Sequence, residues 1–244
     1  MRILVTNCNT TVAMTREIAA GARAAASAGT VIVPLTPAWG PESAEGWLDS
    51  YLSAAAVLDT LRVHDAAAPE PYHAVVMAGF GEHGREGVRE LLDVPVVDIT
   101  EAAAHLACLL GRRYGVVTTL ERSRPLIEDS LRTAGVAANC AAVVATGLGV
   151  LELDEGPATT AAFLDAARRA RDAGAEVLVL GCAGMTGLRE LRDRVAAELG
   201  LPVVDGVAAA VQLAESVVRL GLRTSRSGSY AALRDKRRVW GGAG

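Results

Sequence analysis

Cys182 stands in a setting that can turn a thiol into an acid/base group. It follows the apolar run 177–180 and Gly181, and Ala183 and Gly184 come directly after it. Backbone N–H groups in such a turn, and at the start of a following helix, can lower a thiol pKa from ~8.5 toward neutrality. We therefore expect Cys182 to carry protons at a carbon atom of a substrate.

A second copy of this setting lacks the cysteine. The apolar run 74–78 leads into Gly79, Phe80 and Gly81, which places Gly79 opposite Cys182 in the repeat. Two such loops facing one cleft would supply acid/base groups to both faces of one carbon. In this chain one of the two groups is absent.

Other segments repeat in the same order. The segment 94–98 is echoed by 201–205, and an alanine-rich stretch with helical apolar spacing follows each copy. A weaker echo relates 2–7 to 113–118. Ordered echoes at one long spacing indicate two similar lobes. We expect residues 1–100 plus 207–244 to form the first lobe and residues 101–206 to form the second.

Short Val/Ile/Leu-rich runs alternate with Ala/Arg/Glu-rich stretches along the whole chain. This alternation predicts an α/β fold with two pseudo-symmetric lobes, each a mainly parallel sheet flanked by helices, and the active site in the cleft between them. The expected strands are 2–6, 30–33, 74–78, 95–99, 114–118, 141–145, 176–180 and 202–205. The expected helices are 11–28, 46–67, 86–92, 101–111, 122–134, 158–173, 187–199 and 207–220.

Composition excludes several classes of function. The 244 residues are 51% hydrophobic, and the net charge of −4 comes with Lys and Arg spread along the chain, which argues against nucleic acid as a partner. No apolar run reaches the ~18 residues of a membrane span, and residues 1–10 do not resemble a secretory signal, so we expect a cytoplasmic protein.

The four cysteines lack metal-ligand spacing and are expected to be reduced, with Cys108 and Cys140 in the core. Residues 224–244 are expected to be a frayed tail.

The loop after the second apolar run also fits a dinucleotide-binding pattern. Residues 79–84 read GxGxxG, and Asp98 follows at a suitable spacing. The motif is not on the first strand, however, and its helix is short, so we expect no cofactor. Asn9, beside Cys8, and Thr118 with Thr119 are helix-capping residues that also direct donors at the cleft. His83 is positioned to titrate near neutral pH.

Dispersed motifs along the chain resemble the hydantoin and allantoin racemase branch of the aspartate/glutamate racemase superfamily. These motifs are residues 7–11, 40–46, 78–81, 118–120, 147–151, 181–185 and 224–230.

The resemblance implies a cofactor-free enzyme that racemises a hydantoin, allantoin or a related ureide between its lobes. One cysteine from each lobe would flank the stereocentre, and Cys182 matches that of the second lobe. The resemblance also implies a homo-oligomer and no metal. The residues that would hold the ring and the enolate oxygen are Asn9, Ser43, Phe80, Gly81, Thr118, Thr119, Ala183 and Gly184.

This chain departs from the family pattern at Gly79, where the first cysteine is usual, and at Cys8, where proline is usual. Glycine has no proton to exchange, so three alternatives stay open. The chain is a disabled variant, or it uses Glu82, His83 or a water as the second group, or it works on one face only. One-face chemistry resembles arylmalonate decarboxylases, which carry glycine at this place. A ligand-binding sensor on the same scaffold is a further alternative.

Overall fold

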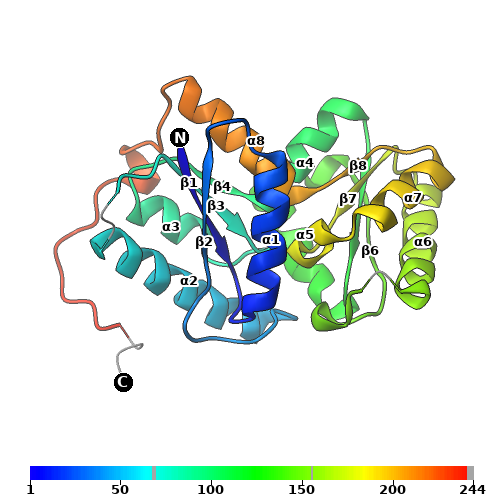
Figure 1. Cartoon of the computed structure of the whole chain (residues 1–244), viewed down its shortest axis with the longest axis horizontal. Coiled ribbons are helices and arrows are strands. Elements are labelled where there is room, and N and C mark those ends of the chain that lie inside the picture. Colours follow the sequence, from blue (N-terminus) through cyan, green and yellow to red (C-terminus); the bar gives the residue numbers. More distant parts are fainter. Residues whose placement is uncertain (68–69, 155, 241–244) are drawn as a thin grey trace.

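The computed structural model of this chain describes residues 1–67, 70–154 and 156–240, and it contains two parallel sheets side by side (Figure 1). Each has four strands, in the orders β2-β1-β3-β4 and β6-β5-β7-β8. This arrangement confirms the predicted α/β fold. The strands are β1 (Arg2–Asn7), β2 (Val31–Leu35), β3 (Ala74–Ala78), β4 (Val96–Asp98), β5 (Tyr114–Thr118), β6 (Cys140–Ala145), β7 (Val177–Leu180) and β8 (Val203–Val204).

The α-helices follow the strands in alternation. They are α1 (Val12–Ala25), α2 (Trp47–Ala67), α3 (Arg85–Leu91), α4 (Ile99–Leu110), α5 (Arg124–Thr133), α6 (Pro157–Asp172), α7 (Arg189–Leu199) and α8 (Gly206–Arg219). Short 3₁₀ turns include η1 (Glu121–Ser123), η3 (Val150–Glu152) and η4 (Ala183–Gly187). The predicted helix 122–134 thus begins as the turn η1 and becomes α-helical where Pro125 suits a first turn.

The outer faces of the two sheets are covered by different helices. Figure 1 shows α2 and α3 outside the first sheet and α6 and α7 outside the second, with α1 and α8 between the sheets. Side chains from β1, such as Ile3, and from β7, such as Val179, belong to one shared core cluster. Each sheet also has an apolar cluster of its own on its outer side, around Phe163 in the second sheet and around Val57 in the first. The division into lobes 1–100 plus 207–244 and 101–206 stays a prediction.

The helices α4 and α8 meet between the sheets and start in the same way. Asp98 accepts hydrogen bonds from the N–H groups of Thr100 and Glu101, and Asp205 accepts one from Ala208. A β-carbon on Gly206 would lie only 3.0 Å from the carbonyl oxygen of Ile99, so the two starts approach closely. Aspartate caps of this kind satisfy donors that the first helical turn leaves free.

The predicted frayed tail is docked over its first part. The Thr224 hydroxyl donates to the Val94 carbonyl at 2.8 Å, and Arg226 lies 2.6 Å from the Asp93 carboxylate. The Tyr230 hydroxyl donates to a carboxylate oxygen of Glu86. These bonds hold the segment against α3 and the loop before β4, and residues 241–244 of that prediction lie outside the described residues. Cys108 and Cys140 are only partly buried and pack at the margin of the core.

None of the described helices combines the length and apolarity needed to cross a membrane.

The cap residue Asp98 also faces a buried cation, and the pair predicts a measurable effect on stability. Arg85 Nη1 lies 3.6 Å from the Asp98 carboxylate, and both side chains are almost fully excluded from solvent. Asp98→Ala removes the cap and one of the anions that neutralise Arg85, so we expect unfolding free energy to fall by about 3 kcal/mol or more. Urea titration of both proteins measures this difference.

The matched control is Asp193→Ala, which removes an exposed carboxylate paired with Arg192. We expect it to change stability by less than about 0.5 kcal/mol, because exposed ion pairs contribute little. Equal effects of the two substitutions would contradict a special role for Asp98.

Candidate active site

Strand register brings the loops at the carboxyl ends of the central strands together. Asn7 of β1 pairs with Ala78 of β3, so Cys8 and Gly79 leave the first sheet side by side. Val117 of β5 pairs with Leu180 of β7, so the second sheet delivers its loops in the same way. Ligand sites in parallel sheets form beyond such strand ends.

A cavity with a volume of about 30 Å³ lies where these loops meet. Both sheets contribute to its wall, together with the segment before α2 and the start of α5. The lining residues are Cys8, Asn9, Met14, Ala44, Ala78, Gly79, Phe80, His83, Thr118, Thr119, Ser123, Ile127, Val150, Gly181, Cys182 and Ala183. The structure therefore brings Cys182 and Gly79 together, as the repeat predicts.

Cys182 is held at the start of the turn η4 by a close approach of two strands. The Gly181 N–H donates to the Val117 carbonyl at 2.7 Å, and a β-carbon on Gly181 would lie 2.9 Å from the same oxygen. Glycine is required at this point, and it places the next side chain in the cavity. The turn η4 begins directly after Cys182, and the Met185 N–H donates to the Cys182 carbonyl at 3.1 Å.

The thiol of Cys182 is harder to ionise than the sequence suggests. Burial raises its pKa to about 11, and the negative charge of Glu45 acts in the same direction. The backbone N–H groups of Gly184 and Met185 oppose this effect but do not overcome it. The expectation of a pKa near neutrality is wrong, because loss of solvent outweighs the turn's donors.

Cys8 occupies the space beside Gly79. A β-carbon on Gly79 would lie 2.7 Å from Cβ of Cys8 and 3.0 Å from its Sγ. The pKa of the Cys8 thiol is raised to about 12, mainly by burial and next by the nearby Cys182. Both thiols therefore belong to one site, although the sequence offers no echo that selects Cys8.

Glu82 and His83 differ in their access to the cavity. Glu82 Oε1 accepts hydrogen bonds from the N–H groups of Gly84 and Arg85 at 2.7 and 2.9 Å, so its carboxylate caps α3. His83 lines the cavity, but burial lowers the pKa of its imidazole to about 4. The expectation that His83 titrates near neutral pH is wrong, because burial destabilises the charged form of the imidazole ring.

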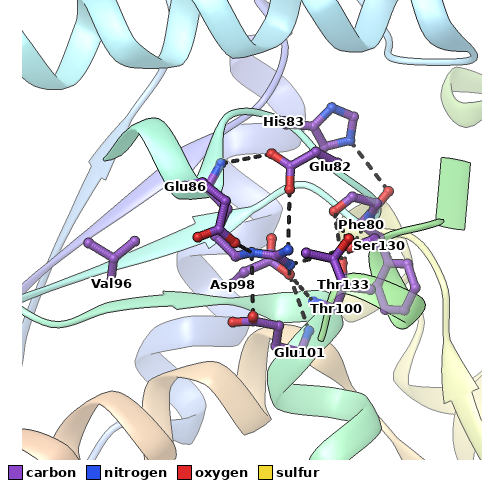
Figure 2. A network of polar contacts seen from close by, with 12 residues as sticks. Phe80, Glu82, His83, Glu86, Val96, Asp98, Thr100, Glu101, Ser130 and Thr133 are labelled. Carbon is purple, nitrogen blue, oxygen red and sulfur yellow. Dashed lines mark hydrogen bonds and ion pairs between the residues drawn. The ribbon is translucent and has the colours of Figure 1, made fainter. Parts of the chain in front are cut away.

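A polar network behind the loop fixes its shape, as Figure 2 shows. The Gly81 N–H donates to the Thr100 hydroxyl at 2.8 Å, and the Gly81 carbonyl accepts from the Ser130 hydroxyl at 3.1 Å. Arg85 lies among the carboxylates of Glu82, Glu86, Asp98 and Glu101. The loop of the first sheet is thus anchored to α4 and α5.

The predicted binding residues are only partly gathered at the cavity. Those that line it are Asn9, Phe80, Thr118, Thr119 and Ala183. Ser43 adjoins the lining residue Ala44, and Gly184 lies beside the Cys182 sulfur. The Gly81 N–H is bonded to Thr100 and faces the network instead of a ligand.

Hydrogen bonds decide which polar groups remain available to a ligand. Asn9 Oδ1 accepts from the Thr11 N–H and from the Asn7 amide, whereas Asn9 Nδ2 has only the Met14 sulfur at 3.1 Å. The Thr118 hydroxyl donates to the Gly181 carbonyl at 3.1 Å. The Asn9 amide is therefore better placed than the Thr118 hydroxyl to donate to a ligand.

Ser123 is a lining residue that the sequence analysis missed. Its hydroxyl and His83 Nδ1 are buried without a hydrogen-bond partner among the described residues. Unpaired buried polar groups are costly, and in a cavity they are typical of a site that a polar ligand completes. Ser123 precedes α5 and looks like an ordinary helix cap in sequence, so only the fold reveals its position.

Comparisons with known proteins identify relatives of this chain. The family model described as Asp/Glu/hydantoin racemase matches residues 3–214. The hydantoin racemase of Pseudomonas sp. (strain NS671) is 38% identical over 94% of this chain and 91% of its own. The solved structure of allantoin racemase from Pseudomonas fluorescens is 54% identical, covers 98% of this chain and 100% of its own, and has a TM-score of 0.92.

A more distant structure shares the fold alone. Unliganded arylmalonate decarboxylase is 18% identical, covers 94% of this chain and 98% of its own, and has a TM-score of 0.59. The match of the family model over most of the chain, and the high identity of the racemases over nearly all of it, decide the assignment. The chain belongs to the Asp/Glu/hydantoin racemase family.

Proposed function

We propose that this protein is a cofactor-independent racemase of 5-substituted hydantoins, allantoin or a related ureide, with Cys182 as an acid/base residue. The observation that carries the proposal is the position of the Cys182 thiol. It lies in a cavity between the carboxyl ends of two sheets, beside buried polar groups that lack partners. The high identity to hydantoin and allantoin racemases supports this choice of substrate class.

The chemistry needs a proton carrier and a group that stabilises negative charge. Removal of the proton at C5 of the ring by a thiolate leaves an enolate, whose charge moves to the adjacent carbonyl oxygen. The donors proposed for this oxygen are the backbone N–H groups of Ala183 and Gly184, which directly follow Cys182 at the start of η4. Preorganised donors of this kind stabilise the developing charge more effectively in a buried site than in water.

The cavity wall suits a small, neutral ring. Phe80, Ile127 and Val150 supply apolar surface, and Asn9 and Ser123 supply donors or acceptors at its edge. Few charged side chains reach this wall, which favours a ureide over a dicarboxylate such as an arylmalonate. Decarboxylation stays the alternative that Gly79 raises, and ligand sensing without turnover is the other.

We also propose that the protein forms homo-oligomers. Trp47, Leu48 and Tyr51 on α2 are exposed, and the rings of Trp47 and Tyr51 lie tilted to each other with centroids 6.2 Å apart. Exposed aromatic and aliphatic side chains gathered on one helix are typical of a contact surface.

A deuterium-exchange experiment tests the proposed reaction. We expect the protein to racemise a single enantiomer of a 5-substituted hydantoin or of allantoin in deuterium oxide and to incorporate deuterium at C5. Cys182→Ser is expected to reduce racemisation at least ~100-fold, because an acid/base group contributes factors of that size. Polarimetry and proton NMR measure the two processes, and Cys108→Ser, which changes a partly buried thiol at the core margin, should retain activity.

Other outcomes identify the alternatives. Release of carbon dioxide from an arylmalonate without racemisation of the ureides would favour the decarboxylase. Protection of Cys182 from alkylation by a bound ureide, with no exchange above the buffer rate, would favour the sensor.

The raised thiol pKa values predict an alkaline pH profile. Burial disfavours the thiolate, so its population at pH 7 is small and grows as pH rises toward the pKa of about 11 for Cys182. We expect kcat/KM to increase about tenfold per pH unit between pH 7 and 9. Initial rates, corrected with Cys182→Ser at each pH for spontaneous racemisation, measure the profile. A plateau reached by pH 7 would contradict the burial effect.

A further inference from the structure

The cavity contains two thiols that come from opposite sheets. Cys182 follows β7 of the second sheet, and Cys8 follows β1 of the first. Racemisation through one planar intermediate requires a proton carrier on each face of the reacting carbon. The position of Cys8 therefore decides whether this chain has the second carrier that Gly79 lacks.

Strand pairing makes Cys8 the immediate neighbour of Gly79. Asn7 and Ala78 are paired across β1 and β3, and the residues that follow them emerge at the same point of the sheet edge. A β-carbon on Gly79 would come within 2.7 Å of Cβ of Cys8. The Cys8 side chain thus fills the volume that a side chain at position 79 would enter, and glycine is what allows it to do so.

The sulfur atom itself lies in this volume. The distance from Cys8 Sγ to the ideal β-carbon position of Gly79 is 3.0 Å, closer than a side chain there would allow. Both cysteines contribute to the cavity wall, and the charge that Cys182 would carry as a thiolate is among the causes of the raised pKa of Cys8. The two sulfurs therefore act on each other across one enclosed space.

Unpaired polar groups lie in the same wall. His83 Nδ1 and the Ser123 hydroxyl are buried without partners in the part of the chain that the structure describes. They indicate a polar ligand between the two thiols. Glu82 is turned away from the role of proton carrier because its carboxylate caps α3, and burial of His83 lowers its pKa to about 4, which disfavours the protonated ring that a proton donor needs.

We propose that Cys8 is the second acid/base residue, so that the thiol absent at Gly79 is supplied from the end of β1. This inference rests on the proposed racemase function. In one direction the Cys182 thiolate takes the C5 proton, and the Cys8 thiol gives its proton to the opposite face of the enolate. Cys182 is then protonated and Cys8 is the thiolate. The reverse reaction, or proton exchange with solvent, restores the first state.

Substitution of each cysteine should affect the two enantiomers in opposite ways. Cys8→Ser is expected to reduce racemisation at least ~100-fold. It should leave deuterium exchange with retention for the enantiomer whose C5 proton faces Cys182, and abolish exchange for the other enantiomer. Cys182→Ser should give the mirror-image pattern. A serine hydroxyl is a far weaker acid than a thiol, so proton transfer should be lost. Because serine preserves the shape of the side chain, the thermal unfolding temperature should change little.

Relocation of the thiol gives a second readout. Gly79→Cys alone is expected to add no activity and to lower thermal stability, because its β-carbon collides with Cys8. Cys8→Gly combined with Gly79→Cys removes that collision, although the His83 ring must still shift. We expect the double variant to racemise at least ~10-fold faster than Cys8→Gly alone.

The outcomes separate the inference from the proposed function. Suppose that the unmodified protein racemises the substrate. If Cys8→Ser then racemises it at a rate within about threefold, or loses deuterium exchange equally for both enantiomers, the proposed role of Cys8 is wrong and the racemase function is retained. If the unmodified protein shows neither racemisation nor exchange, the proposed function fails and the role of Cys8 with it. The complementary loss of exchange supports both.

Discussion

The alanine-lined contact between α4 and α8 sets the spacing of the two sheets, and the cavity depends on that spacing. Small buried residues on both helices, among them Ala103, Ala107 and Ala210, let the helices pack closely inside the shared core. At their starts, Gly206 lies against the Ile99 carbonyl, and the caps Asp98 and Asp205 fix the direction of each helix. A larger side chain at this contact would move one sheet relative to the other, and with it the two thiols.

The enclosed cavity that positions the thiols also disfavours their ionisation. Burial raises the pKa of Cys182 and of Cys8, and the N–H groups of η4 recover only part of the lost solvation of Cys182. The same loss of solvent strengthens the interaction of backbone donors with any negative charge that develops in the cavity. The raised thiol pKa values and the stronger donors have one physical cause, which is the exclusion of solvent by the two closely packed sheets and their helices.

Much of the fold was predictable, whereas the site was predictable only in part. Buried strands such as 74–78 and 114–118 carry apolar runs that define them locally, and the repeat indicated that the loops after them face each other. The segment after α8 looked like a frayed tail, yet Arg226 and Tyr230 bind acidic partners far away in sequence. Ser123 looks like an ordinary helix cap in the sequence. Its position in the cavity could not be predicted, because the residues next to it in the chain do not indicate which residues lie next to it in space.

The sequence alone determined the α/β class, the doubled architecture and the choice of Cys182, because these features depend on apolar periodicity and on residues adjacent in the chain. Only the tertiary structure decided how burial shifts the pKa of that thiol and which residues line the same cavity. Desolvation depends on all the atoms that surround a group, and contact between Cys8 and position 79 depends on the pairing of β1 with β3. Cys8 and Gly79, which are far apart in sequence, thereby become neighbours in the folded protein.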